Sequence, residues 1–292
     1  MIIALYARPV KDNYADYVKT LSTRLNKENI TLIIHSTYFA YLKKEFGFNL
    51  DIPVFTSHSD LKEQRPDYLI SLGGDGTMLE TLDLVRDTGI PVLGVNTGRL
   101  GFLASVYKED FTGAIDKLIH KKFILDVRTL LQLQSPQNLF ECNVALNEVA
   151  LVKKDTSAML SIDVQINGVF LNSYWADGLI VSTPTGSTAY SLSCGGPLLV
   201  PTSESFILTP IAPHNLNVRP VVICSSSVVS LRIRGRDKQN LISLDSRLGT
   251  LQTEEEVVLK KAPYNFNLIN LEGQHFFNTL RNKLMWGLDK RN

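Results

Sequence analysis

One short stretch of the sequence has the residue types and spacing needed to handle phosphate. It reads Gly73-Gly74-Asp75-Gly76-Thr77 and follows the apolar run Tyr68–Leu72, which predicts a buried parallel strand. Glycines leave backbone N–H groups open to a ligand, and at the start of a helix these groups suit phosphate oxygens. A carboxylate repels phosphate, so Asp75 is explained if it holds a divalent cation or takes a proton from an attacking hydroxyl. An aspartate that only caps the following helix is the structural alternative.

A second glycine-containing turn follows the next predicted strand, Ile90–Val95. It runs from Asn96-Thr97-Gly98 to Gly101-Phe102. The side chains of Asn96 and Thr97 can donate hydrogen bonds to ligand oxygens. Because the carboxyl ends of parallel strands face one crevice, we expect both turns to lie beside the same ligand. An ordinary loop between a strand and a helix is the alternative.

The elements around these turns predict an α/β domain over residues 1–124 with a Rossmann-like parallel sheet. Strand-like runs alternate with segments of helical periodicity, which indicates parallel strands joined by right-handed crossovers. The predicted strands are Ile2–Tyr6, Thr31–Ile34, Tyr68–Leu72 and Ile90–Val95, and the predicted helices lie near residues 14–25, 39–46, 79–86 and 109–120.

From about Phe123 the pattern changes, and residues 125–269 predict an all-β domain. Asn167-Gly168 between two apolar runs is a strong hairpin signal. A helical pattern over residues 276–286 predicts that the C-terminal segment 270–292 packs back on the first domain. The predicted strands of the β domain are Leu125–Leu133, Asn143–Val152, Ser161–Ile166, Val169–Tyr174, Leu179–Ser182, Val218–Ile223, Val228–Ile233, Leu241–Leu244 and Glu256–Lys260.

Three groups of polar residues interrupt these predicted strands. Asn147-Glu148 places an amide beside a carboxylate, which can bind ribose hydroxyls and a base or phosphate. A pair that merely faces outward from a strand is the alternative. Asp245 follows a predicted strand. Taken alone, an aspartate in this position is typical of a turn rather than of a binding site.

The richest group runs from Asp177 to Pro197. A strand leads into a turn with the hydroxyls of Thr185, Ser187 and Thr188, and Tyr190 then offers a ring for stacking on a base. The turn and the helix start add backbone N–H donors. A capped short helix without a ligand is the alternative.

The composition excludes several classes of protein. The chain has 30 Lys+Arg against 29 Asp+Glu and a net charge of +1, which is not the charge of a nucleic-acid-binding or membrane-surface protein. No apolar run approaches the length of a membrane span, and the first residues predict a strand rather than a signal peptide. The three cysteines are widely spaced and lack metal-ligand spacing, which favours a reduced, cytoplasmic protein without structural zinc.

In this order the motifs resemble those of the NAD kinase family. The resemblance covers about residues 68–284. G-G-D-G-T alone is also similar to motifs of diacylglycerol kinases, sphingosine kinases and phosphofructokinases, whereas T-P-T-G-S-T-A-Y is much more specific. The matching segments are Gly73–Thr77, Asn96–Gly98, Leu100–Phe102, Asn147-Glu148, Asp177-Gly178, Ser182–Tyr190, Gly195–Pro197, Ala212–His214 and Phe277–Leu280.

The resemblance implies a reaction, a fold and an assembly. The reaction is transfer of the ATP γ-phosphoryl to the 2′-hydroxyl of the adenosine ribose of NAD, which gives NADP and ADP. The implied fold joins an α/β nucleotide-binding domain, similar to that of diacylglycerol kinase and phosphofructokinase, to a β-rich NAD-binding domain. The family needs a divalent cation, usually magnesium, and forms homodimers or homotetramers. The charge balance and the lack of a long apolar run lead us to expect neither a nucleic acid nor a membrane as a partner.

The resemblance also implies roles for single residues. Asp75 is the implied proton acceptor and a possible metal ligand, while Asn147 and Glu148 hold the adenine ribose and neighbouring groups. Asp177 contacts the nicotinamide portion, in one arrangement across a subunit boundary. Several bacterial relatives carry a basic residue where this chain has Trp175, so Trp175 is expected only as a backbone or stacking contact. The remaining implied nucleotide contacts are Gly73, Gly74, Gly76, Thr77, Asn96, Thr185, Thr188, Ala189, Tyr190, Ser191, Leu192, Ser193, Ala212 and Asp245.

Two other functions are compatible with parts of the pattern. A lipid kinase of the same superfamily would need a basic or apolar membrane-facing surface, which the sequence does not indicate. A non-catalytic NAD(P)-binding sensor would not need Asp75 and the whole phosphate turn.

Overall fold

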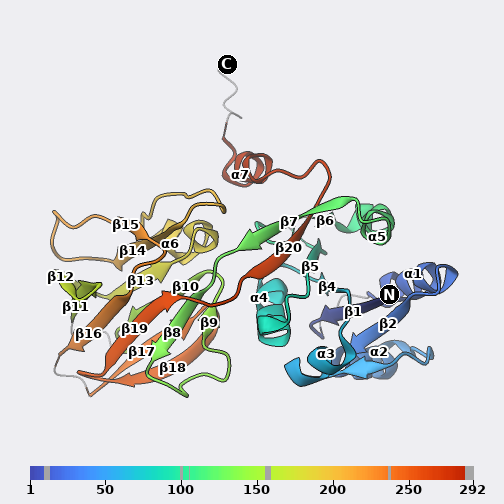
Figure 1. Ribbon diagram of the computed structural model, residues 1–292, viewed down its shortest axis with the longest axis horizontal. Helices are drawn as coiled ribbons and strands as arrows, with labels where there is room; N and C mark the ends of the chain where they lie inside the picture. Colours follow the sequence, from blue (N-terminus) through green and yellow to red (C-terminus); the bar gives the residue numbers. More distant parts are fainter. Residues whose placement is uncertain (10–13, 99–100, 105, 155–158, 236–237, 287–292) are drawn as a thin grey trace. The chain divides into compact units, whose positions relative to one another are not determined.

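Contacts within the chain separate it into two units. The computed structural model describes residues 1–9, 14–98, 101–104, 106–154, 159–235 and 238–286 (Figure 1). The first unit comprises Met1–Val127 together with the chain from Phe266 onward, and the second comprises Arg128–Asn265. The predicted boundaries were 124/125 and 269/270, so the observed ones lie three and four residues away. The assignment of the two units to nucleotide and NAD binding stays a prediction.

The first unit is built on a mostly parallel sheet. Its strand order is β3-β2-β1-β4-β5-β20-β7, and β6 pairs with β5. The pairs along β3-β2-β1-β4-β5-β20 are all parallel. The strands are β1 (Ile2–Ala7), β2 (Thr31–His35), β3 (Val54–Phe55), β4 (Tyr68–Leu72), β5 (Val92–Asn96), β6 (Val106–Tyr107), β7 (Phe123–Arg128) and β20 (Phe266–Leu271).

Helices pack on this sheet, so its central strands are buried and apolar. Every residue of β4 and of β5 is buried, as expected for central parallel strands covered on both faces. The two helix pairs α1 with α5 and α3 with α4 are in contact. The helices are α1 (Ala15–Lys27), α2 (Ser36–Phe46), α3 (His58–Gln64), α4 (Asp75–Val85), α5 (Phe111–Ile119) and α7 (Phe276–Leu284), with short 3-10 turns η1 (Arg86–Thr88) and η2 (Lys108–Asp110).

The strand order of the first unit reverses between β1 and β4. From β1 the chain builds outward through β2 and β3, and it then returns to add β4 and β5 on the other side. Ligands of open α/β sheets bind at such a switch point, outside the carboxyl ends of the strands. Arg8 follows β1 and Gly73 follows β4 at this point.

The second unit contains two six-stranded sheets. The orders are β15-β14-β13-β10-β17-β18 and β12-β11-β16-β19-β8-β9, and the assigned pairings are antiparallel. Apolar side chains from both sheets form one core. The elements are β8 (Leu131–Ser135), β9 (Val144–Ala145), β10 (Glu148–Val152), β11 (Leu160–Ile166), β12 (Val169–Ala176), β13 (Gly178–Ser182), η3 (Thr185–Thr188), α6 (Tyr190–Ser193), β14 (Ser205–Ile211), β15 (Val221–Cys224), β16 (Val229–Arg234), β17 (Gln239–Leu244), β18 (Arg247–Gln252) and β19 (Glu256–Lys261).

Some predicted elements differ from the observed ones. The predicted strand Leu125–Leu133 is two strands, β7 and β8, which belong to different sheets. The predicted strand Asn143–Val152 breaks at Leu146-Asn147 into β9 and β10. The strands β14, which contains Pro210, and β18, which contains Gly249, were not predicted, because proline and glycine are uncommon inside strands. None of the helices in the described part of the chain is long and apolar enough to cross a membrane.

Candidate functional site

Asp75 is held by the backbone of the second glycine-containing turn. It is the first residue of α4, but Gly74 is the N-cap and no side chain caps the helix, so the capping alternative is wrong. Instead the Asp75 carboxylate accepts three hydrogen bonds from consecutive N–H groups. Phe102 N donates to Oδ2 at 2.8 Å, and Leu103 N and Ala104 N donate to Oδ1 at 3.0 Å each.

Only a glycine at position 101 lets the Asp75 carboxylate come this close to the turn. A Cβ atom added at Gly101 would lie 1.7 Å from Asp75 Oδ1. Gly73 N also donates to Val95 O at 2.9 Å, which connects the two turns at their strand ends. The prediction that both glycine-containing turns lie together therefore agrees with the geometry of the first unit.

The donors predicted in the second turn are engaged within the protein. Asn96 is 2% exposed, and its Oδ1 accepts from Gly98 N at 2.7 Å. The Thr97 hydroxyl accepts from the Tyr14 hydroxyl at 2.7 Å. Residues 99 and 100 of the motif lie outside the described part of the chain. Asn96 thus shapes the turn, and its proposed contact with a nucleotide stays a prediction.

Arg8 and Glu80 lie beside the glycine turn, and no role was predicted for either from the sequence. Arg8 Nε and Nη2 donate to the two oxygens of Glu80 at 2.7 Å each, and Nη2 also donates to Gly76 O at 3.2 Å. The Tyr6 hydroxyl donates to Glu80 Oε2 at 2.7 Å. Burial, followed by this hydrogen bond, raises the pKa of Tyr6, so Tyr6 stays a donor at neutral pH.

In the second unit Asp245 organises the segment that carries Asn147 and Glu148. Its Oδ2 accepts from Leu146 N at 2.9 Å, and its Oδ1 accepts from Asn147 N at 2.8 Å and Glu148 N at 3.1 Å. The Asp245 side chain is only 3% exposed. Burial raises its pKa, although these N–H groups and the nearby Arg247 favour the charged form. The geometry thus gives Asp245 a supporting role, and its predicted contact with a nucleotide is untested.

Glu148 is a buried carboxyl with a free oxygen. It is 8% exposed, and no atom of the described residues makes a hydrogen bond to its Oε2. Burial and the charge of Asp245 raise the pKa of Glu148 to about 8, despite a backbone hydrogen bond from Tyr190. At neutral pH this carboxyl is mostly protonated, so it can donate a hydrogen bond as well as accept one.

The hydroxyl-rich turn packs directly on Asn147. Thr183 N donates to Asn147 O at 2.9 Å, and the Thr183 hydroxyl donates to Leu146 O at 2.5 Å. A Cβ atom added at Gly186 would lie 2.1 Å from Asn147 O, so this position requires glycine. The turn between Thr183 and Tyr190 and the Asn147-Glu148 pair therefore form one site in the second unit.

Within this turn the predicted contacts differ in exposure. The hydroxyls of Thr185 and Ser191 are buried and bond to Arg128 and Thr209, respectively. Tyr190 is 41% exposed, and its pKa is raised by burial first and then by the charges of Cys194, Glu148 and Asp177. The residues of this stretch that solvent can reach are Thr188, Ala189, Tyr190, Leu192 and Ser193.

Trp175, Asp177 and Ala212 are neighbours on the second unit. Asp177 forms an ion pair with Lys153 at 2.6 Å, which was not predicted from the sequence. Trp175 O accepts from His214 N at 2.9 Å, and Asp177 N donates to Ile211 O at 2.9 Å. These bonds place the loop that contains Ala212, whose φ is +44°, beside both predicted residues.

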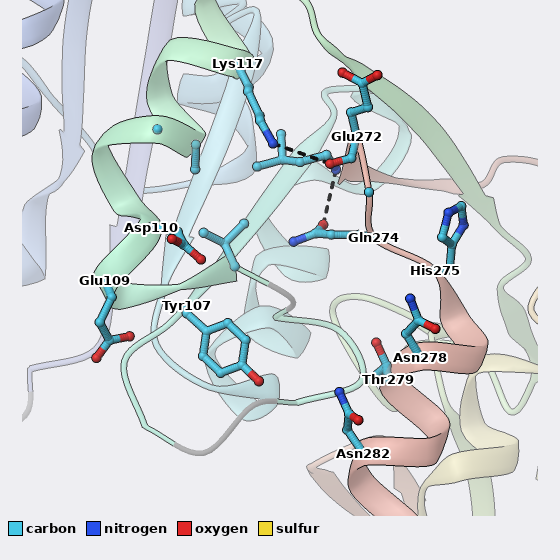
Figure 2. A pocket seen from close by; sticks show the side chains of 15 residues that line it. Tyr107, Glu109, Asp110, Lys117, Glu272, Gln274, His275, Asn278, Thr279 and Asn282 are labelled. Atoms are coloured by element: carbon cyan, nitrogen blue, oxygen red, sulfur yellow. Dashed lines mark hydrogen bonds between the residues drawn. The ribbon is translucent and has the colours of Figure 1, made fainter.

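A separate cavity of about 530 Å³ lies on the first unit, between η2, α5 and α7 (Figure 2). Lys117 Nζ donates to Glu272 O at 3.4 Å on one side of it, and Tyr107 and Asn282 project toward it from other sides. None of the site residues predicted from the sequence lines this cavity, although Asn278 and Thr279 of the matching segment Phe277–Leu280 do. The helix α7 also carries Lys283, whose Nζ lies 5.9 Å from the Phe102 ring centre.

The first prediction concerns the Asp75 contacts. Gly101→Ala should displace the carboxylate from the three N–H groups and lower the free energy of unfolding by about 1–3 kcal/mol. Hydrogen exchange at Phe102–Ala104 should become faster. Gly113→Ala is the matched control, because a Cβ there meets nothing within 4 Å. Equal melting temperatures and equal amide protection in both variants would contradict this account.

The second prediction concerns Asp245, whose φ is +51°. Asp245→Asn keeps a residue that tolerates positive φ, but it places an amide where the carboxylate accepts three N–H groups. We expect a loss of about 1–3 kcal/mol in the free energy of unfolding, measured with urea. The exposed Glu256→Gln in the same unit should change it by less than about 0.5 kcal/mol. A similar small effect at both positions would refute the supporting role.

Comparisons with known proteins agree with this arrangement of motifs. The model of the ATP-NAD kinase N-terminal domain matches residues 5–123, and that of the ATP-NAD kinase C-terminal domain matches residues 146–271. The chain is 47% identical to the NAD kinase of Cytophaga hutchinsonii and 43% identical to that of Christiangramia forsetii, in each case over 100% of both chains.

Solved structures share the fold. The yeast NADH kinase complexed with NADH matches with a TM-score of 0.86 and 23% identity, over 98% of this chain and 88% of that chain. An NAD kinase from Archaeoglobus fulgidus in complex with ATP matches with a TM-score of 0.77 and 24% identity, over 98% and 99%. These likenesses confirm the predicted combination of an α/β unit and a β-rich unit. Since the two family models together cover most of the sequence, the chain belongs to the ATP-NAD kinase family.

Proposed function

We propose that this protein is an NAD kinase that transfers the γ-phosphoryl group of ATP to the 2′-hydroxyl of the adenosine ribose of NAD. The observation that carries the proposal is the Asp75 carboxylate, fixed by three N–H groups at the glycine turn of a chain in this family. Phosphoryl transfer depends on positioning and charge more than on covalent help from the enzyme, and a fixed carboxylate suits that demand.

Asp75 can still accept a proton in this arrangement. A carboxylate has about four acceptor positions, and the three N–H groups occupy two on Oδ1 and one on Oδ2. The remaining position on Oδ2 can receive the proton of the ribose hydroxyl or hold a cation. A general base of this kind accelerates a reaction by ~10²–10⁴-fold.

The second unit supplies the groups for NAD. The protonated Glu148 carboxyl can exchange hydrogen bonds with ribose hydroxyls, and the exposed Tyr190 ring can stack on the adenine. Asp177, held by Lys153, is the proposed contact for the nicotinamide portion. Asn147, Thr188 and Ala212 complete the proposed contacts near these groups.

A divalent cation, with magnesium the expected ion, fits this site only as a partner of the substrate phosphates. Among the described residues no group of three or more His, Cys, Asp or Glu could hold a metal ion. Magnesium is commonly bound by one or two carboxylates together with phosphates and water, so Asp75 alone can supply the protein ligand. When bound, the cation neutralises charge on the transferring phosphoryl group.

A homodimer or homotetramer and a cytoplasmic location are part of the proposal. The edge strand β12 exposes Val169, Phe170 and Trp175, which are 71%, 59% and 58% accessible. Exposed apolar edge strands are typical places for subunit contacts. The proposed compartment rests on the three cysteines, which are thiols rather than halves of a disulfide.

The third prediction tests the role of Asp75. Asp75→Asn should retain the fold and the affinity for NAD, with a loss of about 1–3 kcal/mol in the free energy of unfolding as for Asp245→Asn. It should lower kcat by ~10²–10⁴-fold because the general base is lost. The assay is NADP formation from ATP, magnesium and NAD by the purified protein. Asp16→Asn, on the exposed face of α1, is the control and should have normal turnover. Near-normal turnover of Asp75→Asn would sink the role of this carboxylate.

The fourth prediction uses the pKa of about 8 of Glu148. The folded protein binds this proton more tightly than the unfolded chain, whose ordinary value is 4.5. The contribution of Glu148 to the free energy of unfolding therefore falls as the pH rises from 4.5 through 8. Ionisation also places a charge beside Asp245, so NAD affinity should weaken through the same upper pH range.

Calorimetric titration with NAD between pH 6 and 9 measures this dependence. Glu148→Gln, which stays neutral, should bind NAD more weakly than the wild type at pH 7 but with an affinity that is independent of pH. A pH-dependent loss of affinity that is equal in both proteins would assign the titration to another group.

A further inference from the structure

We propose that Arg8 is a phosphate-binding residue for the polyphosphate tail of the phosphoryl donor. The inference deepens the proposed function, since it assumes a nucleoside triphosphate donor at the glycine turn. Its basis is the position, the orientation and the charge of one guanidinium group.

The position follows from the sheet topology. Arg8 comes directly after β1, and Gly73 comes directly after β4. β1 and β4 are parallel neighbours, with Ala7 paired to Leu72. Because the strand order reverses between them, their carboxyl ends form the switch point at which ligands of such sheets bind. Arg8 is thus a cation at the edge where the phosphate turn lies.

The guanidinium lies directly over Gly76. A Cβ atom added at Gly76 would lie 3.5 Å from Arg8 Nη1 and 3.7 Å from Nη2. These are ordinary van der Waals distances, so the guanidinium lies in contact with the turn at this position. Nη2 also donates to Gly76 O at 3.2 Å, which keeps the Arg8 charge close to the backbone of the turn.

Glu80 orients the guanidinium and leaves one nitrogen available. The Glu80 carboxylate accepts from Nε and Nη2, and Gly76 O accepts from Nη2. Within the described part of the chain no hydrogen bond involves Nη1. The Arg8 and Glu80 side chains are 42% and 35% exposed, so a ligand can reach the group. A guanidinium that is already oriented loses little conformational entropy when it binds phosphate.

A bracing role is the competing explanation. Arg8 could merely hold α4 against β1 through Glu80 and Gly76, and its loss would then disturb Asp75 at the start of α4. Removal of the Glu80 carboxylate would cause the same disturbance, whereas a phosphate contact belongs to Arg8 alone. This difference separates the two explanations.

The experiment compares Arg8→Gln, Arg8→Lys and Glu80→Gln with the wild type. Titration calorimetry with magnesium ATP in the absence of NAD gives the donor affinity, and steady-state assays give the two KM values. Arg8→Gln should weaken ATP affinity by about ten- to a hundredfold and leave KM for NAD unchanged. Arg8→Lys should retain part of the affinity, because the charge remains. Arg24→Gln on α1 removes a similar arginine paired with Asp116 and Glu28, and should leave ATP binding unchanged.

Two results would overturn the inference. One is unchanged ATP affinity in Arg8→Gln. The other is a Glu80→Gln variant that reproduces the whole loss, because the phosphate contact predicts only a partial loss when the guanidinium keeps its charge but loses its orientation. Failure of the proposed function can be told apart from failure of this inference, because the calorimetric titration measures ATP binding without turnover. A wild type that binds ATP through Arg8 but forms no NADP would sink the kinase proposal and leave the phosphate contact standing.

Discussion

The structure depends on a carboxylate that accepts three consecutive backbone N–H groups. Asp75 makes this contact with the turn over Phe102–Ala104 in the first unit, and Asp245 makes it with the segment Leu146–Glu148 in the second. In each case the aspartate follows a strand end and fixes a segment far away in the sequence. Hydrogen bonds to a charged acceptor are stronger than neutral ones, so each contact can fix an irregular turn.

The two carboxylates differ in whether an acceptor position remains for a ligand. Asp75 keeps one acceptor position in a turn without side chains, whereas Asp245 is enclosed and serves its neighbours. One of those neighbours is Glu148, whose raised pKa arises from its own burial and from the charge of Asp245. In the second unit the Asp245 contact therefore lies beside a carboxyl that is mostly protonated at neutral pH.

Elements that follow from a short, continuous residue pattern can be predicted from the sequence. The bounds of β4 are as predicted, because five consecutive buried residues stop at a glycine. Internal hydrogen bonds are not visible in a sequence, so Thr185 was assigned as a ligand contact although its hydroxyl is buried against Arg128. Arg8 was missed for a related reason, since its importance arises only when β1 and β4 become neighbours across more than sixty residues.

The position of β20 has a consequence for synthesis on the ribosome. This strand pairs with β5 and lies between β5 and β7 in the sheet order, yet it is made after the whole second unit. The second unit is one continuous segment, so all of its strands are available as soon as residue 265 has emerged. The nascent first unit has a gap in its sheet until then, because β5 has only β4 and the short β6 as partners. During chain elongation the second unit is therefore complete before the first, although its synthesis starts later.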